Sequence, residues 1–162
     1  MGLVGDMDLA GNMMLRSFRK GGKFFMADRK SPRELAEQVI DELEVVTPSV
    51  HTPVRRLSGG NVQKVLVGRE IASAPKVLMT AYAVRGLDIN SSYTIYDLIN
   101  KQKEAGVAVI FVGEDLDVLL ELSDRILVLC GGKVSGIVDG PGADKNQIGL
   151  MMTQIGGEPT HE

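Results

Sequence analysis

The sequence predicts an α/β protein with a mostly parallel sheet, preceded by a helical segment. Two observations lead to this prediction. The first third of the chain spaces its apolar residues as helices do, whereas from Leu57 onward helical stretches alternate with short apolar runs. Such alternation is typical of parallel strands joined by helices. With 162 residues, of which 44% are hydrophobic, the chain can form about one domain with a buried core.

Two helices are expected in the first third. The first covers residues 8–19, where apolar side chains recur on one face. The second has Ser31 as its N-cap and Pro32 at its first helical position, and Glu34 is placed to close a capping box. Residues 47–53 then form a loop, because a residue that precedes proline is disfavoured in helical geometry.

The alternating part begins with a helix that follows Ser58 and stops before Pro75. The apolar run Val77–Met79 is then predicted to be a buried strand. A further helix covers about residues 92–105 and leads into the strand Val107–Val112.

The last part continues the pattern. A short helix is expected over residues 115–122, followed by a strand over residues 125–130. Gly131 and Gly132 then allow a tight turn, because such turns need positive φ, and residues 133–138 return as the second strand of a hairpin. The tail, residues 156–162, is expected to be frayed.

Composition excludes several classes of protein. The 18 Lys and Arg residues against 21 Asp and Glu give a net charge of −3, so we expect no nucleic-acid partner. The single cysteine, Cys130, excludes a disulfide framework and fits a reducing compartment. No apolar run approaches the roughly 18 residues of a membrane span, and nothing resembles a signal peptide. A cytoplasmic protein is expected.

The segment Leu57–Lys64, with the sequence LSGGNVQK, carries the clearest chemical signal. Two glycines between a hydroxyl residue and a helix start let backbone amides approach an oxyanion, and the helix N-terminus adds partial positive charge. A phosphate-facing surface is one interpretation. The other is an ordinary helix that is capped by Ser58 after a glycine turn.

The longer string resembles the signature motif of ABC (ATP-binding-cassette) ATPases, in the form found in importers of simple sugars and nucleosides. Three further landmarks agree in order and spacing. Pro75–Met79 is similar to the strand that carries the Walker B motif, Arg85–Asp88 to the D-loop, and Ser123–Ile126 to the segment after the switch loop. The resemblance implies part of a P-loop NTPase (ABC cassette) core with an N-terminal helical subdomain.

The resemblance also implies a division of the chain. Residues 1–74 would form the helical subdomain, ending in the signature motif and its helix, and residues 75–155 the C-terminal part of the ATPase core. The family's P-loop, which ends in Gly-Lys-Ser/Thr, has no match in the sequence. The chain is therefore expected to begin just after the family's Q-loop, with the P-loop strand lying before Met1.

By resemblance, the signature residues form half of an ATP site, which a P-loop from another chain completes. ATP and Mg²⁺ are then expected only in that composite site, with no cofactor for the isolated chain and no metal site of its own. The residues expected to contact the nucleotide are Ser58, Gly59, Gly60, Asn61, Gln63 and Asp88.

Three positions depart from the family's catalytic pattern. The Asp-Glu pair that ends the Walker B strand corresponds to Ala81 and Tyr82, which offer neither a ligand for Mg²⁺ nor a base at neutral pH. The switch histidine corresponds to Glu114, which would repel a phosphate; helix-dipole complementation at a helix start is its structural interpretation. We expect no intact catalytic residue and no hydrolysis by the isolated chain.

The resemblance implies the ATP-binding component of a sugar or nucleoside importer, with a P-loop-bearing cassette and a membrane permease as partners and a location at the cytoplasmic side of the membrane. A non-catalytic interaction module derived from a cassette is the alternative, which Ala81, Tyr82 and Glu114 favour. A sheet without its P-loop strand would leave an edge and apolar faces uncovered, so we expect an oligomer or a partner-dependent fold.

Overall fold

The computed structural model divides into two compact units, Met1–Ile110 and Phe111–Glu162, and each is described by itself. The predicted boundary between functional parts at residue 74 stays a prediction, because this division follows compactness alone. Ser31, with its predicted capping box, and the tail lie outside the described residues. The structure describes residues 2–17, 32–84 and 86–153.

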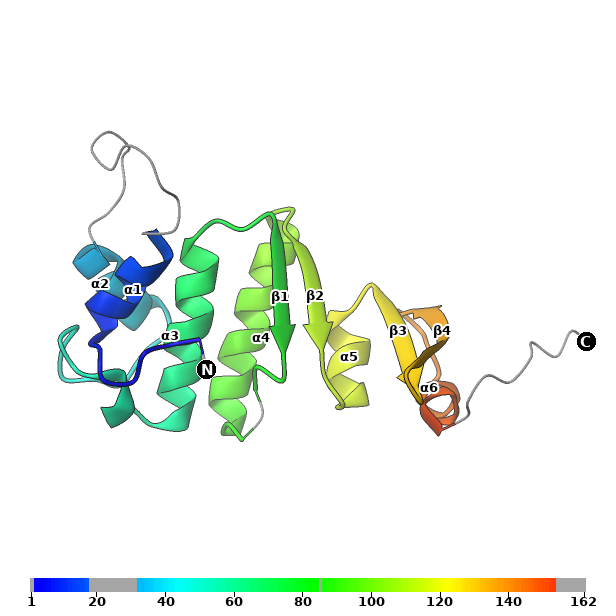
Figure 1. The fold of residues 1–162 in the computed structure, drawn as a ribbon. Coiled ribbons are helices and arrows are strands. Elements are labelled where there is room, and N and C mark those ends of the chain that lie inside the picture. Colours follow the sequence, from blue (N-terminus) through cyan, green and yellow to red (C-terminus); the bar gives the residue numbers. More distant parts are fainter. Residues whose placement is uncertain (1, 18–31, 85, 154–162) are drawn as a thin grey trace, which may run out of the picture. The chain divides into compact units, whose positions relative to one another are not determined.

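The first unit contains a helical part. Its elements are α1 (Leu9–Ser17), α2 (Pro32–Glu42), the 3-10 turn η1 (Val54–Arg56), α3 (Gly59–Ala72) and α4 (Ile89–Glu104) (Figure 1). Helix α1 packs against α2, α2 against α3, and α3 against α4. Leu9, Met13, Leu43 and Val65 are at most 2% exposed in the core that these helices share. The two helices predicted for the first third are thus confirmed.

Local caps decide where these helices begin. Asp8 Oδ1 accepts a hydrogen bond of 2.7 Å from the backbone N–H of Gly11, in the first turn of α1. Helix α4 begins at Ile89, three residues before the predicted start, because Asp88 is its N-cap. Asp88, which lies in the segment that resembles the D-loop, thus also has a capping role.

A two-stranded sheet follows, built from β1 (Val77–Ala81) and β2 (Ala108–Val112). The two strands run parallel (Figure 1). The predicted strand at Val77–Met79 is confirmed as part of β1, but its predicted burial is wrong for two of the three residues: Leu78 is 6% exposed, whereas Val77 and Met79 are 53% and 71% exposed. Only one side of β1 is covered, so alternate side chains stay in solvent.

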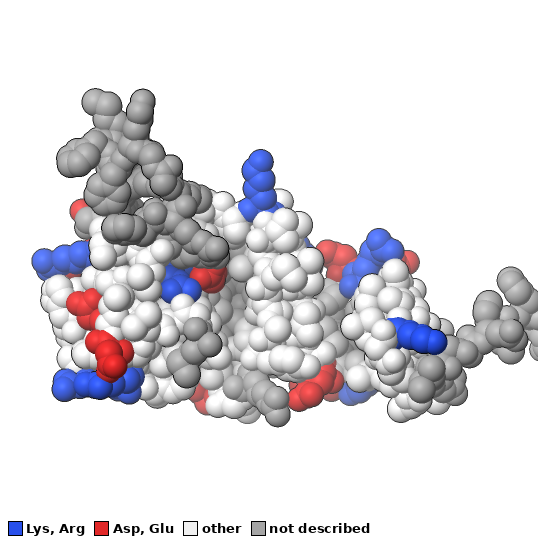
Figure 2. Space-filling model, viewed as in Figure 1, with Lys and Arg blue, Asp and Glu red and all other residues white. Residues whose placement is uncertain are grey.

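The other side of this sheet is an apolar surface. Figure 2 shows almost no charged side chain over β1 and β2. We call this surface the open sheet face. Its large exposed side chains are Val77 and Met79 of β1 and Ile110 and Val112 of β2.

The second unit contains α5 (Leu116–Leu122), β3 (Arg125–Cys130), β4 (Lys133–Asp139) and α6 (Lys145–Thr153). Strands β3 and β4 form the predicted antiparallel hairpin, with an irregularity at Val128/Leu129. Its turn is made by Gly131 and Gly132, with φ of 55° and 77°. Ile126, Val128 and Ile148 form the buried core of this unit.

Candidate functional site

The start of α3 contains the predicted signature residues. Ser58 is the N-cap, in extended geometry, and its Oγ accepts a 3.4 Å hydrogen bond from the backbone N–H of Asn61. Gly59 and Gly60 are the first two residues of the helix. Because the first N–H groups of a helix have no partner within it, the helix presents donors at this end.

Among the described residues of the first unit, no packing contact requires either glycine. A β-carbon at Gly59 would meet nothing within 4 Å. At Gly60 it would lie 3.4 Å from Ser91 Oγ, which is an ordinary van der Waals contact. Neither residue has the positive φ that favours glycine. The internal structure of the first unit therefore does not explain why this helix begins with two glycines.

The same position brings the signature segment against the start of α4. A β-carbon at Gly60 would lie 3.8 Å from Oδ2 of Asp88, the N-cap of α4. Two predicted site residues that are 28 positions apart in the sequence thus lie together. Ser91, which sequence reasoning missed, is the side chain that comes nearest to this β-carbon position; it could have been recognised as the residue three positions after a capping aspartate.

Asp88 acts as a cap in this structure. Its Oδ1 accepts from the Ser91 backbone N–H at 2.9 Å, and its Oδ2 accepts from the Ser91 hydroxyl at 2.7 Å. The backbone hydrogen bond, the hydroxyl and the charge of Lys64, in decreasing order, lower the pKa of the Asp88 carboxyl below its usual value. Asp88 is therefore ionised at neutral pH.

Asn61 connects the signature segment to a loop that lies before it in the sequence. Its Oδ1 accepts from the Val46 N–H at 3.0 Å, and its Nδ2 lies 3.4 Å from the Val46 carbonyl oxygen. The same Nδ2 donates to Ser58 Oγ at 3.0 Å. The Asn61 side chain thus touches both a backbone segment and the signature serine.

Lys64, one helical turn further on, holds the same loop. Its side chain is buried, and its Nζ donates to the Glu44 carbonyl oxygen at 3.4 Å. Glu44 has a φ of 48°, so its backbone is in the left-handed region that glycine favours. Gln63, between the two, is half-buried on α3.

The positions that depart from the catalytic pattern lie in both units, and each is described within its own unit. Ala81 and Tyr82 lie exposed at the carboxyl end of β1, and Tyr82 has a φ of 53°. Glu114 is exposed in the second unit, just before Asp115, which caps α5 by accepting from the N–H groups of Asp117 and Val118. Arg85, in the D-loop segment, lies outside the described residues.

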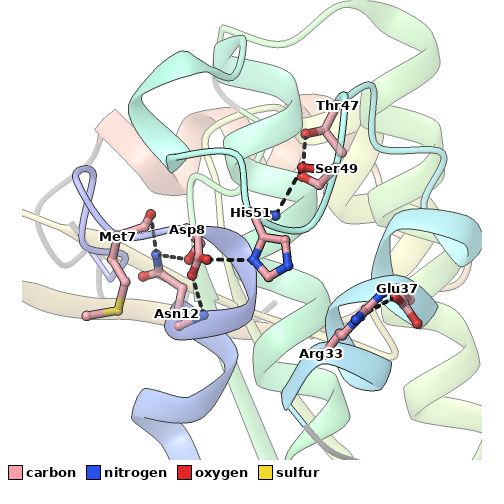
Figure 3. Close-up of polar contacts among 9 residues, drawn as sticks. Met7, Asp8, Asn12, Arg33, Glu37, Thr47, Ser49 and His51 are labelled. Carbon is pink, nitrogen blue, oxygen red and sulfur yellow. Dashed lines mark hydrogen bonds and ion pairs between the residues drawn. The ribbon is translucent and has the colours of Figure 1, made fainter.

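A second polar cluster joins the start of α1 to residues 47–53 (Figure 3). His51 Nδ1 lies 3.2 Å from Asp8 Oδ2, and the backbone N–H of His51 donates to Ser49 Oγ at 3.3 Å. Among the described residues, no three of His, Cys, Asp and Glu gather as a metal ion would need. This cluster fastens a loop to a helix start.

No helix within the described ranges combines the length and apolar character that a bilayer crossing requires. A cavity of about 250 Å³ lies where α2, α3 and α4 meet. Its lining is mainly apolar, and its only titratable side chain is that of Glu42. This lining does not suggest catalysis.

Curated proteins similar to this chain are described as sugar import ATP-binding proteins. The xylose import ATP-binding protein XylG of Moorella thermoacetica is 41% identical over 135 residues, which is 83% of this chain and 27% of that protein. The ribose import ATP-binding protein RbsA of Rhodopirellula baltica is 37% identical over 91% of this chain and 29% of its own length. The galactose/methyl galactoside import ATP-binding protein MglA of Escherichia coli is 34% identical, again over 91% of this chain and 29% of its own length. The chain thus spans about three tenths of these relatives.

Solved structures share the fold. A dimeric ATP-binding cassette, MJ0796, bound to ADP and phosphate, has a TM-score of 0.73 at 23% identity, over 87% of this chain and 60% of that one. The cassette MJ1267 of an ABC transporter has a TM-score of 0.64 at 17% identity, over 91% of this chain and 59% of the cassette. No protein-family model matches the chain. The structural likeness confirms the fold class predicted from the sequence.

Proposed function

Because the chain belongs to the ATP-binding proteins of ABC transporters, we propose that it supplies the signature half of an ATP site in a sugar or nucleoside importer. The observation that carries the proposal is the pair Gly59-Gly60 at a helix N-terminus, where a β-carbon at Gly59 would meet nothing within 4 Å and one at Gly60 would make only ordinary contacts. Glycine is less favourable than alanine in a helix by up to about 1 kcal/mol. A ligand that must approach the backbone closely accounts for two such residues.

The donors at this surface suit a phosphate. The N–H groups that begin a helix have no partner within it, and they and the positive end of the α3 dipole both favour an anion. Ser58 adds a hydroxyl at the same point, and its side chain is exposed. The residues present therefore fit the phosphate end of a nucleotide, which a P-loop on another polypeptide segment would hold from the opposite side.

The residues at the end of β1 do not fit a magnesium ion. Mg²⁺ is usually bound through carboxylates and substrate phosphates, and Ala81 and Tyr82 supply no carboxylate. We assign no catalytic step to this chain. In the proposal Mg²⁺ arrives with the nucleotide on the P-loop segment, and this chain binds and encloses the phosphate.

The proposed partners are a P-loop-bearing cassette and a membrane permease, through which the chain would sit at the cytoplasmic side of the membrane. Ala81 and Tyr82 also favour a second candidate, a non-catalytic interaction module that docks without nucleotide. The two candidates differ in whether docking depends on ATP.

The test is sedimentation of the chain mixed with a P-loop-bearing cassette from a sugar importer, with Mg²⁺-ATP, with Mg²⁺-ADP and without nucleotide. The proposal expects a complex only with ATP. Ser58→Arg should abolish the complex, because a bulky side chain blocks the approach that the glycines permit. Association without nucleotide would instead establish the interaction module, and no association would overturn both candidates.

Gly59→Ala gives the sharpest variant, with Gly149→Ala as its matched control. Both glycines are helical, and a β-carbon at either would meet nothing within 4 Å. Both substitutions should leave the fold intact or slightly more stable, because alanine favours the helix. Only Gly59→Ala should weaken the ATP-dependent complex. Equal complexes for both variants would mean that Gly59 faces no ligand.

A further inference from the structure

We propose that Asn61 is a positioning residue that makes the Ser58 hydroxyl a hydrogen-bond donor toward the ligand. The inference rests on the proposed function, since it specifies how the signature surface meets a phosphate. Three groups carry it: the Val46 backbone, the Asn61 amide and the Ser58 hydroxyl, which form one chain of hydrogen bonds.

The orientation of the Asn61 amide follows from its partner. A backbone N–H can only donate, so the atom 3.0 Å from the Val46 nitrogen must be the Asn61 oxygen. The Nδ2 group then faces the Val46 carbonyl oxygen, at 3.4 Å, and Ser58 Oγ, at 3.0 Å. The reverse orientation would put two donors against each other at Val46.

This orientation determines the role of Ser58. A hydroxyl has one hydrogen to donate and two lone pairs that accept. Ser58 Oγ accepts from Asn61 Nδ2 at 3.0 Å and from the Asn61 backbone N–H at 3.4 Å, so both lone pairs are engaged. In the part of the chain that the structure describes, the hydroxyl hydrogen has no acceptor. Ser58 therefore offers a donor to solvent, which matches a phosphoryl oxygen and not another donor.

The loop that orients Asn61 is itself held by α3. The Val46 side chain is 79% exposed, so its own packing does not fix this residue. Its backbone is fixed by Asn61, and the carbonyl of Glu44 is fixed by the buried Lys64. Asn61 and Lys64 are three residues apart and lie on one face of α3, so they hold residues 44–46 at two points.

Asn61→Asp is the informative substitution because it keeps the size of the side chain. The introduced carboxylate still accepts from the Val46 N–H, but it can no longer donate to Ser58, whose hydroxyl must then turn and donate to that carboxylate. We expect ATP-dependent association to weaken about ten- to a hundredfold, which is the loss of a hydrogen bond to a charged group. Asn61→Ala should weaken it less, because the Ser58 hydroxyl is then free to rotate.

A double-mutant cycle separates this role from charge repulsion and from direct contact between Asn61 and the nucleotide. If Asn61 acts through Ser58, Asn61→Asp should cause no further loss in a Ser58→Ala background. If the new charge repels the phosphate, or if Asn61 binds the nucleotide itself, the same fold-loss should appear in both backgrounds. That second result would overturn the inference.

An NMR measurement on the chain alone tests the hydrogen-bond chain without any nucleotide. The Val46 amide should lose protection from hydrogen exchange in Asn61→Ala and keep it in Asn61→Asp. Equal protection in the wild type and Asn61→Ala would overturn the inference whatever the partner does. A failure of the proposed function looks different: the wild type would form no ATP-dependent complex, while the Val46 amide would still respond to Asn61.

Discussion

Gly68 of α3 faces Val39 of α2 so closely that a β-carbon at position 68 would lie 2.7 Å from Val39 Cγ1. The same β-carbon would lie 2.9 Å from Leu43 Cδ1. Val39 and Leu43 are 3% and 2% exposed, so both are enclosed in the core. The approach of α2 to the helix that begins with the signature segment thus depends on this one small residue.

We therefore predict that Gly68→Ala destabilises the chain, although alanine is the better helix former. Forcing a methyl group into a closely packed core costs about 1–3 kcal/mol, which exceeds the gain of up to about 1 kcal/mol in helix propensity. Chemical denaturation followed by far-UV circular dichroism measures the difference. Gly59→Ala and Gly149→Ala are the controls, and an increase in stability for all three variants would contradict the close approach.

A buried asparagine supports the segment that precedes α1. Asn12 is 0% exposed, and its Nδ2 donates to the carbonyl oxygens of Met7 and Asp8 at 3.1 and 2.9 Å (Figure 3). Its Nδ2 also donates to the Val4 carbonyl oxygen at 3.0 Å, and its Oδ1 accepts from the Val4 N–H at 2.8 Å. Asn12→Leu keeps the number and branching of the side-chain heavy atoms but leaves these backbone groups without a partner. We expect a loss of roughly 2–3 kcal/mol in the free energy of unfolding.

Urea denaturation of Asn12→Leu measures this loss, and Met14→Leu on the same helix is a suitable control. Met14 is 38% exposed, so its replacement by another apolar side chain should change stability little. If Asn12→Leu were as stable as the wild type, the polar groups around position 12 would be satisfied in another way.

The helix starts show why part of the fold could be predicted. The Pro32 start of α2, the Asp115 cap of α5 and the Gly131-Gly132 turn depend on local geometry, which the sequence states directly. The covering of β1 depends on neighbours that are distant in sequence. An apolar run such as Val77–Met79 is compatible with burial of both faces of a strand but does not require it. In the structure only the face that carries Leu78 is buried.

The candidate site shows the same limit. The motif identified Ser58, Gly59 and Gly60 because their chemistry lies in one short segment. The partner of Asn61 could not be predicted, since Val46 is 15 residues away and contributes only backbone atoms, which have no sequence signature. The approach of Gly60 to Ser91 could not be predicted either, because it depends on how α3 packs against α4.

The lowered pKa of Asp88 predicts a pH dependence of stability. The native state favours the ionised carboxyl, so its contribution is fully present above the unfolded-state pKa, about 3.9, and is lost as the pH falls through the lower native value. Asp88→Asn keeps an acceptor for Ser91 but cannot ionise. We expect its melting temperature to lie a few degrees below that of the wild type near neutral pH.

Thermal melts of both proteins between about pH 7 and pH 3 check this prediction. The difference should stay constant down to about pH 5 and shrink below about pH 4, where the wild-type carboxyl becomes protonated in the unfolded chain. If the difference in melting temperature between the two proteins grew on acidification, the ionised Asp88 carboxylate would not stabilise the native state, and the prediction would be wrong.

The open sheet face predicts self-association or dependence on a partner. Met79 and Ile110 are 71% and 47% exposed on it, and large exposed apolar patches mark interaction surfaces. We expect the chain to sediment above its monomer mass of 17.5 kDa at micromolar concentration. Met79→Lys with Ile110→Lys should shift it toward the monomer without loss of secondary structure, because both side chains already reach solvent.

Ile89→Lys is the matched control for this double variant. Ile89 is 74% exposed at the start of α4 and is not part of the sheet, so its replacement should leave the sedimentation of the chain unchanged. An equal shift with Ile89→Lys would attribute the association to added charge alone. A monomeric wild type with one cooperative unfolding transition would contradict this prediction. The chain would then be stable with its open sheet face in water, although each Å² of apolar surface that stays hydrated costs about 25 cal/mol.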